Sequence, residues 1–336
     1  MRSGLDKRVI KANFSGAACT YDTYAGIQRE ASNGLAEHVL KAACAKKGLS
    51  SASSGAEPFL GAYPALHFSG RSLSVLDIGC GTGTLLGMLR RGMPHAMLFG
   101  CDMAVPMLVA AKRRGGNLRL CGADFEALPF KDSSFDIAAS SLAYQWSADI
   151  VSAFKEAHRA LRPAGLFAFA AFGPKTLFEL KASLKRAAKK NRCGRWPVFV
   201  DYEPLSRLIP MLEAEGLSVI LSECRPVERA YDNLIELLKT LKMVGALNWT
   251  DERPKGLKSG AVLREASRLY SARFPAIGRH GIRATYELVF IVAEKSPSPF
   301  PLPIGERIKP APACSKRGVR GGIGGFTDGF KDKKAY

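Results

Sequence analysis

Short apolar runs alternate with amphipathic segments through the first half of the chain. The apolar runs have the length and composition of buried strands, and they cover residues 73–79, 96–102, 118–124, 135–142 and 165–172. The clearest segments of helical spacing between them are residues 84–91, 106–114 and 149–161. Strand and helix units of this length predict an α/β fold, a doubly wound parallel sheet with helices on both faces.

The second half departs from this alternation. Helical spacing is found in residues 176–191 and 204–216, and a strand-like run follows at 217–231. The next strand-like run begins only near residue 285. Between these two strands, residues 232–281 contain two stretches of helical spacing, which predict a helical insert before the last strand.

The composition fits a globular protein and limits where it works. Of the 336 residues, 47% are hydrophobic, so the chain can bury a sizeable core. The richest apolar run, residues 166–172, is too short to span a bilayer, and residues 1–16 lack the apolar stretch of a signal peptide. Eight cysteines and five histidines show no metal-binding spacing. We therefore expect a cytoplasmic protein with no metal and no membrane anchor.

The chain is strongly basic, with a formal net charge of +19. A field of this sign attracts acidic proteins, nucleic acids or anionic membranes. No nucleic-acid-binding motif accompanies the charge, so we expect neither nucleic acid nor a membrane as partner. Residues 296–336 hold eight Lys or Arg and three acids and are rich in proline and then glycine, which predicts a disordered basic tail.

Acidic residues close the first three predicted strands. Asp77 ends the first strand, Asp102 the second and Asp124 the third, and ligands of parallel sheets bind at these carboxyl ends. After Asp77 the stretch VLDIGCGTGTLL (75–86) continues with three glycines, Gly79, Gly81 and Gly83. Glycines let a backbone approach a ligand closely, and the N–H groups at the start of the next helix favour a carboxylate or phosphate. The acids and the loop therefore predict a cofactor site.

The spacing of the glycine loop separates three classes of cofactor. A dinucleotide-binding fingerprint, GxGxxG, requires a third glycine where this chain has Thr84, and a triphosphate-binding loop requires a lysine that does not follow here. What remains is D-x-G-x-G-x-G with a second acid, Asp102, at the end of the next strand. This pattern resembles the cofactor site of the class I S-adenosylmethionine-dependent methyltransferases, which have a Rossmann-like sheet.

The resemblance implies a role for each part of this site. Asp77 and the loop from Gly79 to Gly83 would contact the methionine moiety of S-adenosylmethionine, and Asp102 would bind the ribose. Asp124 would meet the adenine amino group and Phe125 the face of the adenine ring. Three more residues complete the implied cofactor site, namely Tyr21, Met103 and Ser140.

Four stretches resemble one family more closely, the malonyl-acyl-carrier-protein O-methyltransferases of biotin biosynthesis. The stretch at 9–35 carries that family's N-terminal pattern in six residues, Phe14, Ala17, Ala18, Tyr21, Asp22 and Gln28. The other stretches are SSLAYQW (140–146), LKTLKMVGALN (238–248) and ATYELVFIVAEK (284–295). The resemblance covers about residues 7–295.

This closer resemblance implies how the chain is organised. A methyltransferase domain would occupy residues 1–295, with an N-terminal helical lid segment at 1–70, a cofactor-binding core at 71–175 and a cap inserted at 232–281. Residues 296–336 would follow as the tail. The cap would roof the substrate entrance, and the protein would be a monomer.

The implied reaction methylates the free carboxyl of malonyl-acyl-carrier protein, or of malonyl-CoA, early in pimeloyl formation. Such a carboxyl is already ionised at neutral pH, so no catalytic acid or base is required, and alignment and exclusion of water suffice. The candidate substrate-binding residues are Tyr144, Trp146, Arg279 and Arg283. The candidate residues for docking the acidic carrier are Lys181, Lys185, Arg186 and Lys189.

The sequence leaves other activities open. A methyltransferase that acts on another small carboxylic acid or on a quinone-type ring would share every cofactor motif. Proteins with similar motifs also include an arginine hydroxylase and assembly factors that act by binding. The alternative methyltransferases would differ from this family only in the insert.

Overall fold

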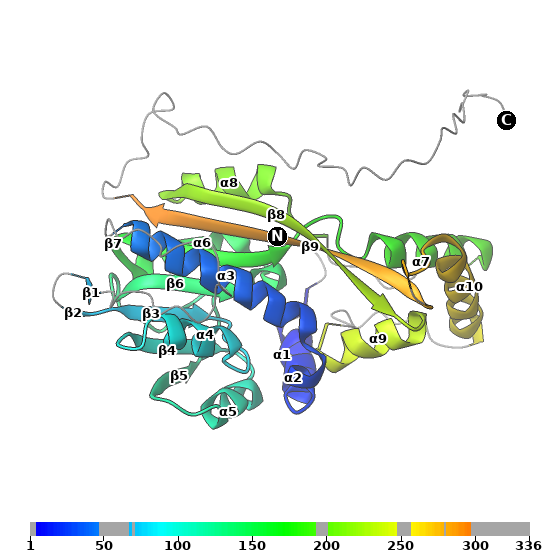
Figure 1. Ribbon diagram of the computed structural model, residues 1–336, viewed down its shortest axis with the longest axis horizontal. Coiled ribbons are helices and arrows are strands. Elements are labelled where there is room, and N and C mark those ends of the chain that lie inside the picture. Colours follow the sequence, from blue (N-terminus) through cyan, green and yellow to red (C-terminus); the bar gives the residue numbers. More distant parts are fainter. Residues whose placement is uncertain are drawn as a thin grey trace.

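Seven strands of the described chain form the central sheet, in the order β5-β4-β3-β6-β7-β9-β8 (Figure 1). They are β3 (Ser74–Ile78), β4 (Met97–Asp102), β5 (Leu118–Gly122), β6 (Phe135–Ser141), β7 (Leu161–Phe172), β8 (Leu217–Tyr231) and β9 (Ile282–Lys295). Two short strands, β1 (His67–Phe68) and β2 (Arg71–Ser72), pair separately. The computed structural model describes residues 5–46, 67–68, 71–192, 201–246, 257–278 and 280–296.

The directions of the strands fix where a ligand binds. Strands β3 to β7 run parallel to one another, whereas β9 is antiparallel to both of its neighbours. All five residues of β3 are buried, as expected of a strand that is covered on both faces. The chain passes from β3 to β4 on one side and later returns to β6 on the other. The carboxyl end of β3 is therefore the switch point at which open α/β sheets bind ligands.

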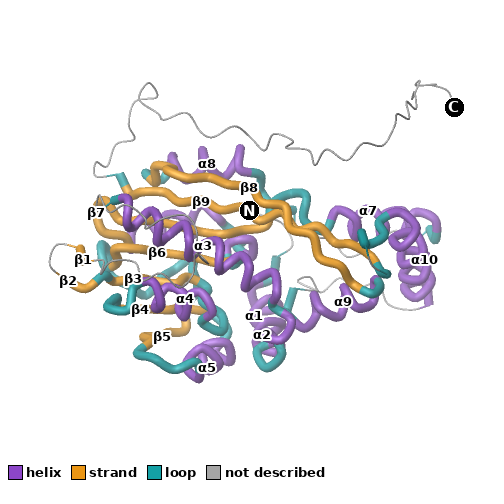
Figure 2. The backbone as a smooth tube through the Cα atoms, in the orientation of Figure 1, coloured by secondary structure: helices purple, strands orange, loops and turns teal. Residues whose placement is uncertain are grey.

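Helices cover both faces of the sheet, which confirms the doubly wound α/β prediction (Figure 2). The core on one face includes buried residues of α3 (Gly26–Ala45) and α4 (Thr84–Gly92). The core on the other face includes residues of α6 (Ile150–Ala160) and α8 (Leu205–Ala214). Helix α5 (Val105–Arg113) connects β4 to β5. Helix α6 begins where Asp149 accepts hydrogen bonds from the N–H groups of Val151 and Ser152, a typical N-cap.

The N-terminal segment has two roles. Helix α3 belongs to the core, because Ala31, Leu35 and Val39 are buried on it. Helices α1 (Lys7–Ala17) and α2 (Tyr21–Tyr24) lie instead beside the carboxyl ends of the strands (Figure 1). Among the described residues of this segment, α1 and α2 are therefore the helices that lie beside this edge of the sheet.

The last two strands carry a helical unit. Helices α9 (Leu234–Met243) and α10 (Leu257–Arg273) lie between β8 and β9 in the chain, and α10 packs against α7 (Phe178–Lys190). Strands β8 and β9 extend together beyond the rest of the sheet, and these helices lie at their far end (Figure 1). Residues 297–336 are outside the described residues, so the disordered tail and the domain boundaries stay predictions. Within the described ranges, none of the helices has the length and apolarity to cross a membrane.

Candidate cofactor and substrate site

The glycine loop bends tightly at the end of β3. Gly79, Gly81 and Gly83 have φ values of 70°, 52° and 78°, a backbone conformation that favours glycine. A side chain at Gly79 would also collide with Ala143, whose Cβ lies 2.4 Å from the ideal Cβ position. Gly83 precedes α4 and packs against Ala111 of α5. Gly79 and Gly81 therefore shape the site, and Gly83 supports the helix behind it.

Two carboxylates flank this loop and differ in their partners. Asp102 accepts hydrogen bonds from the N–H groups of Gly81 (2.9 Å) and Ala104 (2.8 Å). Burial raises the pKa of Asp102, and these two N–H groups oppose the rise. Asp77 is 1% exposed, and neither carboxylate oxygen has a hydrogen-bond partner in the described structure. Burial, and then the negative charge of Asp102, raise the pKa of Asp77 well above its usual value. A cationic ligand group fits such a carboxylate.

A first small cavity, of about 60 Å³, lies beside Asp102. Met103 and Phe125 line it together with Ile10 and Phe14 from α1. An acid that can accept hydrogen bonds from hydroxyl groups and an apolar, aromatic wall suit the ribose and the base of a nucleoside. This placement agrees with the roles expected for Asp102, Met103 and Phe125.

A second cavity, of about 30 Å³, is lined by Asp77 and by Arg29 of α3. An acid and a cation in one cavity suit the ammonium and carboxylate groups of an amino acid. The two small cavities share four lining residues, which are Tyr21, Gly79, Gly81 and Ser141. The lining of the two cavities together therefore matches the chemical groups of a nucleoside joined to an amino acid, as in S-adenosylmethionine.

Helix α2 is tied to the glycine loop by polar contacts. The Thr82 hydroxyl donates a hydrogen bond to one carboxylate oxygen of Asp22 (2.7 Å), and Arg114 binds the other (2.5 Å). Arg114 also donates to the carbonyl of Thr82 (2.6 Å). These contacts hold Tyr21, the neighbour of Asp22, over the cofactor cavities.

Asp124 lies differently from what the resemblance implies. Its carboxylate accepts from Lys7 of α1 (2.6 Å) and from the N–H of Glu126 (2.9 Å). It does not line either small cavity. In this structure Asp124 ties down the lid helix, so its contact with the adenine amino group stays a prediction.

Two further candidates face away from the cavities. The Ser140 side chain is fully buried and donates to the carbonyl of Ile78 (2.8 Å), and its neighbour Ser141 lines the cavities instead. Tyr144 is 1% exposed among aromatic rings of the core, including Phe125 and Phe169. Successive residues of a strand point to opposite faces, so the Ser140 side chain points away from the cavities that Ser141 lines, and a contact of Ser140 with the cofactor stays a prediction.

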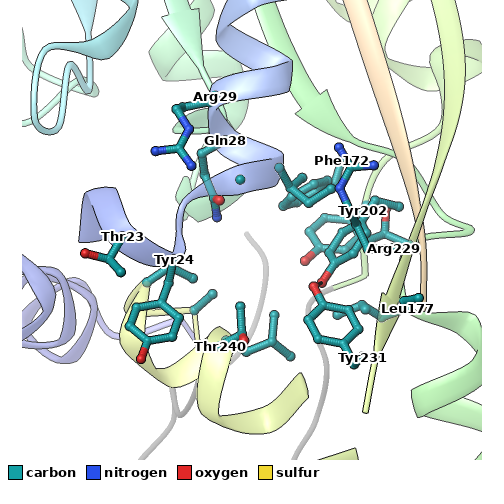
Figure 3. Close-up of a pocket in the computed structure, with 18 of the residues that line it drawn as sticks. Thr23, Tyr24, Gln28, Arg29, Phe172, Leu177, Tyr202, Arg229, Tyr231 and Thr240 are labelled. Atoms are coloured by element: carbon teal, nitrogen blue, oxygen red, sulfur yellow. Dashed lines mark hydrogen bonds between the residues drawn. The ribbon is translucent and has the colours of Figure 1, made fainter. Parts of the chain in front are cut away.

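A larger cavity, of about 260 Å³, adjoins the cofactor cavities (Figure 3). Trp146 lines both this cavity and the first small one, and Gln28 and Arg29 line both this cavity and the second. Its remaining wall includes two cations, Lys181 of α7 and Arg229 of β8. Four tyrosines also line it, namely Tyr24, Tyr202, Tyr231 and Tyr286. This arrangement makes it the candidate substrate cavity, and Trp146, a predicted substrate-binding residue, is part of its lining.

The sequence did not identify the cations of this cavity. Arg283 does not line it, and Arg279 lies outside the described residues. Lys181 was grouped with the surface lysines, although Leu180, Leu184 and Ala188 mark the buried side of α7 and the spacing to Leu184 and Ala188 places Lys181 beside it. Arg29 directly follows Gln28 of the family pattern, so its position was a usable signal. Nothing local in the sequence marks Arg229.

Removal of the Asp102 carboxylate should weaken cofactor binding. For Asp102→Ala we expect a loss of about 1.5 to 3 kcal/mol in S-adenosylmethionine binding with the fold intact, the range for charge-assisted hydrogen bonds. Calorimetric titration measures this, with Asp132→Ala as the control, since the Asp132 side chain is 76% exposed. Equal affinities of Asp102→Ala and the parent would rule out the ribose assignment.

Comparisons with known proteins agree with the geometry. A family model for a methyltransferase domain matches residues 76–169. The malonyl-[acyl-carrier protein] O-methyltransferase of Methylococcus capsulatus is 30% identical over 293 residues, which cover 86% of this chain and 94% of that protein. The protein of the same name from Geobacter sulfurreducens is 31% identical over 295 residues, 87% of this chain and 100% of the relative. The biotin biosynthesis bifunctional protein BioHC of Teredinibacter turnerae is 29% identical over 300 residues, 86% of this chain and 47% of that protein. The chain therefore belongs to the malonyl-[acyl-carrier protein] O-methyltransferase family and is an S-adenosylmethionine-dependent methyltransferase.

Proposed function

We propose that this methyltransferase esterifies the free carboxyl of a malonyl thioester, carried by acyl-carrier protein or by coenzyme A. The observation that carries the proposal is the charge of the substrate cavity. Arg29, Lys181 and Arg229 line it, and no Asp or Glu does so among the described residues. An anionic acyl group is attracted to such a lining. The names of the relatives support the same substrate.

Esterification of a carboxylate asks little of the side chains. S-adenosylmethionine supplies a methyl group on a sulfonium, so that a carboxylate oxygen forms the new O–C bond while the C–S bond breaks and its electron pair stays on sulfur. No proton moves, because a carboxyl group with a usual pKa of about 4 is already ionised. The protein has to align the reactants and exclude water. A lid, a glycine loop and an adjoining cavity serve those two purposes.

The cavity also weighs against the alternative activities. An arginine side chain, the substrate of an arginine hydroxylase, would bring a cation to a wall that already carries three. A quinone-type ring would pack on the tyrosines but would bring no negative charge to the cations of the lining. A malonyl thioester has a free carboxylate for the cations and an acyl chain that can pack on the tyrosines.

The ester product suits an early step of biotin biosynthesis, the pathway in the name of the bifunctional relative. A charged acyl end is costly to bury in an apolar channel. Its methyl ester is neutral, so enzymes of fatty-acid synthesis would extend it as an ordinary acyl chain toward pimelate.

The exposed face of α7 is the proposed docking surface for an acidic carrier. Lys185, Arg186 and Lys189 are exposed there, and Lys190 pairs with Glu265 of α10 (3.0 Å). Lys181 is not part of this surface, since it lines the cavity. A monomer that docks the carrier on this face would hold it on the helix that also borders the substrate cavity.

Methyl transfer to a panel of acceptors tests the proposed function. The protein, incubated with methyl-labelled S-adenosylmethionine, should form the methyl ester of malonyl-acyl-carrier protein or malonyl-CoA and should not label acetyl-CoA, which has no free carboxyl. Label transferred only to a free small acid, to a quinone-type ring, or to no acceptor would contradict the proposal.

Charge reversal tests the docking surface. Lys185→Glu, Arg186→Glu and Lys189→Glu together should reduce turnover of malonyl-acyl-carrier protein mainly through association and should change turnover of malonyl-CoA much less. Physiological salt should narrow the gap to the parent, because exposed charges are screened over about 8 Å. The control reverses Arg91, Lys112 and Arg113, which are exposed on α4 and α5. Equal losses on both substrates, or the same loss in the control, would refute docking by α7.

A further inference from the structure

Three cations line the substrate cavity, and the cofactor accounts for one of them. Arg29 also lines the cavity beside Asp77, where it suits the methionine carboxylate. Lys181 and Arg229 line only the largest of the three cavities described above. Building on the proposed function, we infer that Lys181 and Arg229 together bind the acyl carboxylate and select substrates that carry one.

Arg229 is held in place by the protein on one side. One guanidinium nitrogen forms an ion pair with Glu30 of α3, and another donates to the carbonyl of Glu228 (3.1 Å). These contacts use only part of the donor set of a guanidinium, which can bind a carboxylate through two parallel hydrogen bonds. Glu30 therefore fixes the direction of Arg229 without using all of its donors.

Lys181 lines the same cavity from a different element, helix α7. Its ammonium lies 5.1 Å from the centre of the Tyr202 ring, and the residue is half-buried. Burial lowers the pKa of Lys181, and the charge of Asp201 acts in the other direction. A bound carboxylate would offset the desolvation of this ammonium, so the side chain favours an anionic ligand in the cavity.

The positions of the cations also orient the carboxylate. Figure 3 shows Gln28 and Arg29 on one side of the cavity and Arg229 with Tyr231 on the other. Gln28 and Arg29 form the wall toward the cofactor, so a carboxylate held by Arg229 and Lys181 turns its second oxygen toward that wall. The ester formed there is neutral, so Arg229 and Lys181 bind the product more weakly than the carboxylate substrate.

Binding of two coenzyme A thioesters tests the inference apart from catalysis. Protein saturated with S-adenosylhomocysteine is titrated with malonyl-CoA and with acetyl-CoA, which differ by the carboxylate. The parent should prefer malonyl-CoA by at least about tenfold, since a site built for a polar group rejects the analogue that lacks it. Lys181→Met and the double variant Arg229→Gln/Glu30→Gln, which leaves no unpaired Glu30, should each reduce the preference to below about threefold.

Controls separate charge from packing. Lys239→Met removes an exposed lysine of α9 next to the cavity residue Thr240 and should keep the full preference. Lys181→Arg keeps the charge and should restore most of it. All variants should bind S-adenosylhomocysteine as the parent does, which verifies that the cofactor site is folded.

The outcomes distinguish this inference from the proposed function. An unchanged preference in both cation variants overturns the inference, even where the parent methylates malonyl-CoA. A parent without preference for malonyl-CoA overturns it as well. A preference that the variants lose supports the inference, even where methyl transfer to malonyl thioesters fails and only the proposed function falls.

Discussion

A buried carboxylate without a protein partner is the constraint around which this site is built. Asp77 is placed at the end of β3 by the sheet, and both of its oxygens lack hydrogen bonds within the described structure. Burial and the charge of Asp102 disfavour its ionised form. In the ligand-free protein this carboxylate reduces stability, and the ammonium of a bound amino-acid moiety would remove the penalty. The fold thus retains a buried acid that has no hydrogen-bond partner among the described residues and that a ligand can satisfy.

The other parts of the site follow from this placement. Gly79 lets the loop pack closely against Ala143, and open space lies beside Gly81. The contacts of Asp22 and Lys7 hold α2 and α1 beside the carboxyl ends of the strands. Arg229 of β8 lines the larger cavity that adjoins this site. A low-dielectric site strengthens every charge interaction inside it, which favours the alignment of an anion with a sulfonium.

The sequence predicted the features that are encoded by neighbouring residues. It did not predict contacts between residues that are far apart in the chain. The strands, the glycine loop and Asp102 are local features, because apolar runs and glycine spacing are read within a few residues. The family pattern indicated Ser140, whereas Ser141 lines the cavities, because successive residues of a strand point to opposite faces. Arg229 is held in place by Glu30, 199 positions away, and no local spacing in the sequence reveals that contact. Contacts between distant residues were therefore harder to predict from the sequence than the helices and strands were.

The measurement that tests this account most directly is the stability and cofactor affinity of Asp77→Asn. The raised pKa means that the penalty is absent below the usual value of about 3.9 and grows as pH rises above it, and the amide removes it. At neutral pH the ligand-free variant should melt higher than the parent, with a difference that shrinks toward pH 4, and S-adenosylhomocysteine should bind at least about tenfold more weakly. Asp132→Asn serves as the exposed control. A variant that melts lower than the parent and binds S-adenosylhomocysteine equally well would contradict the account.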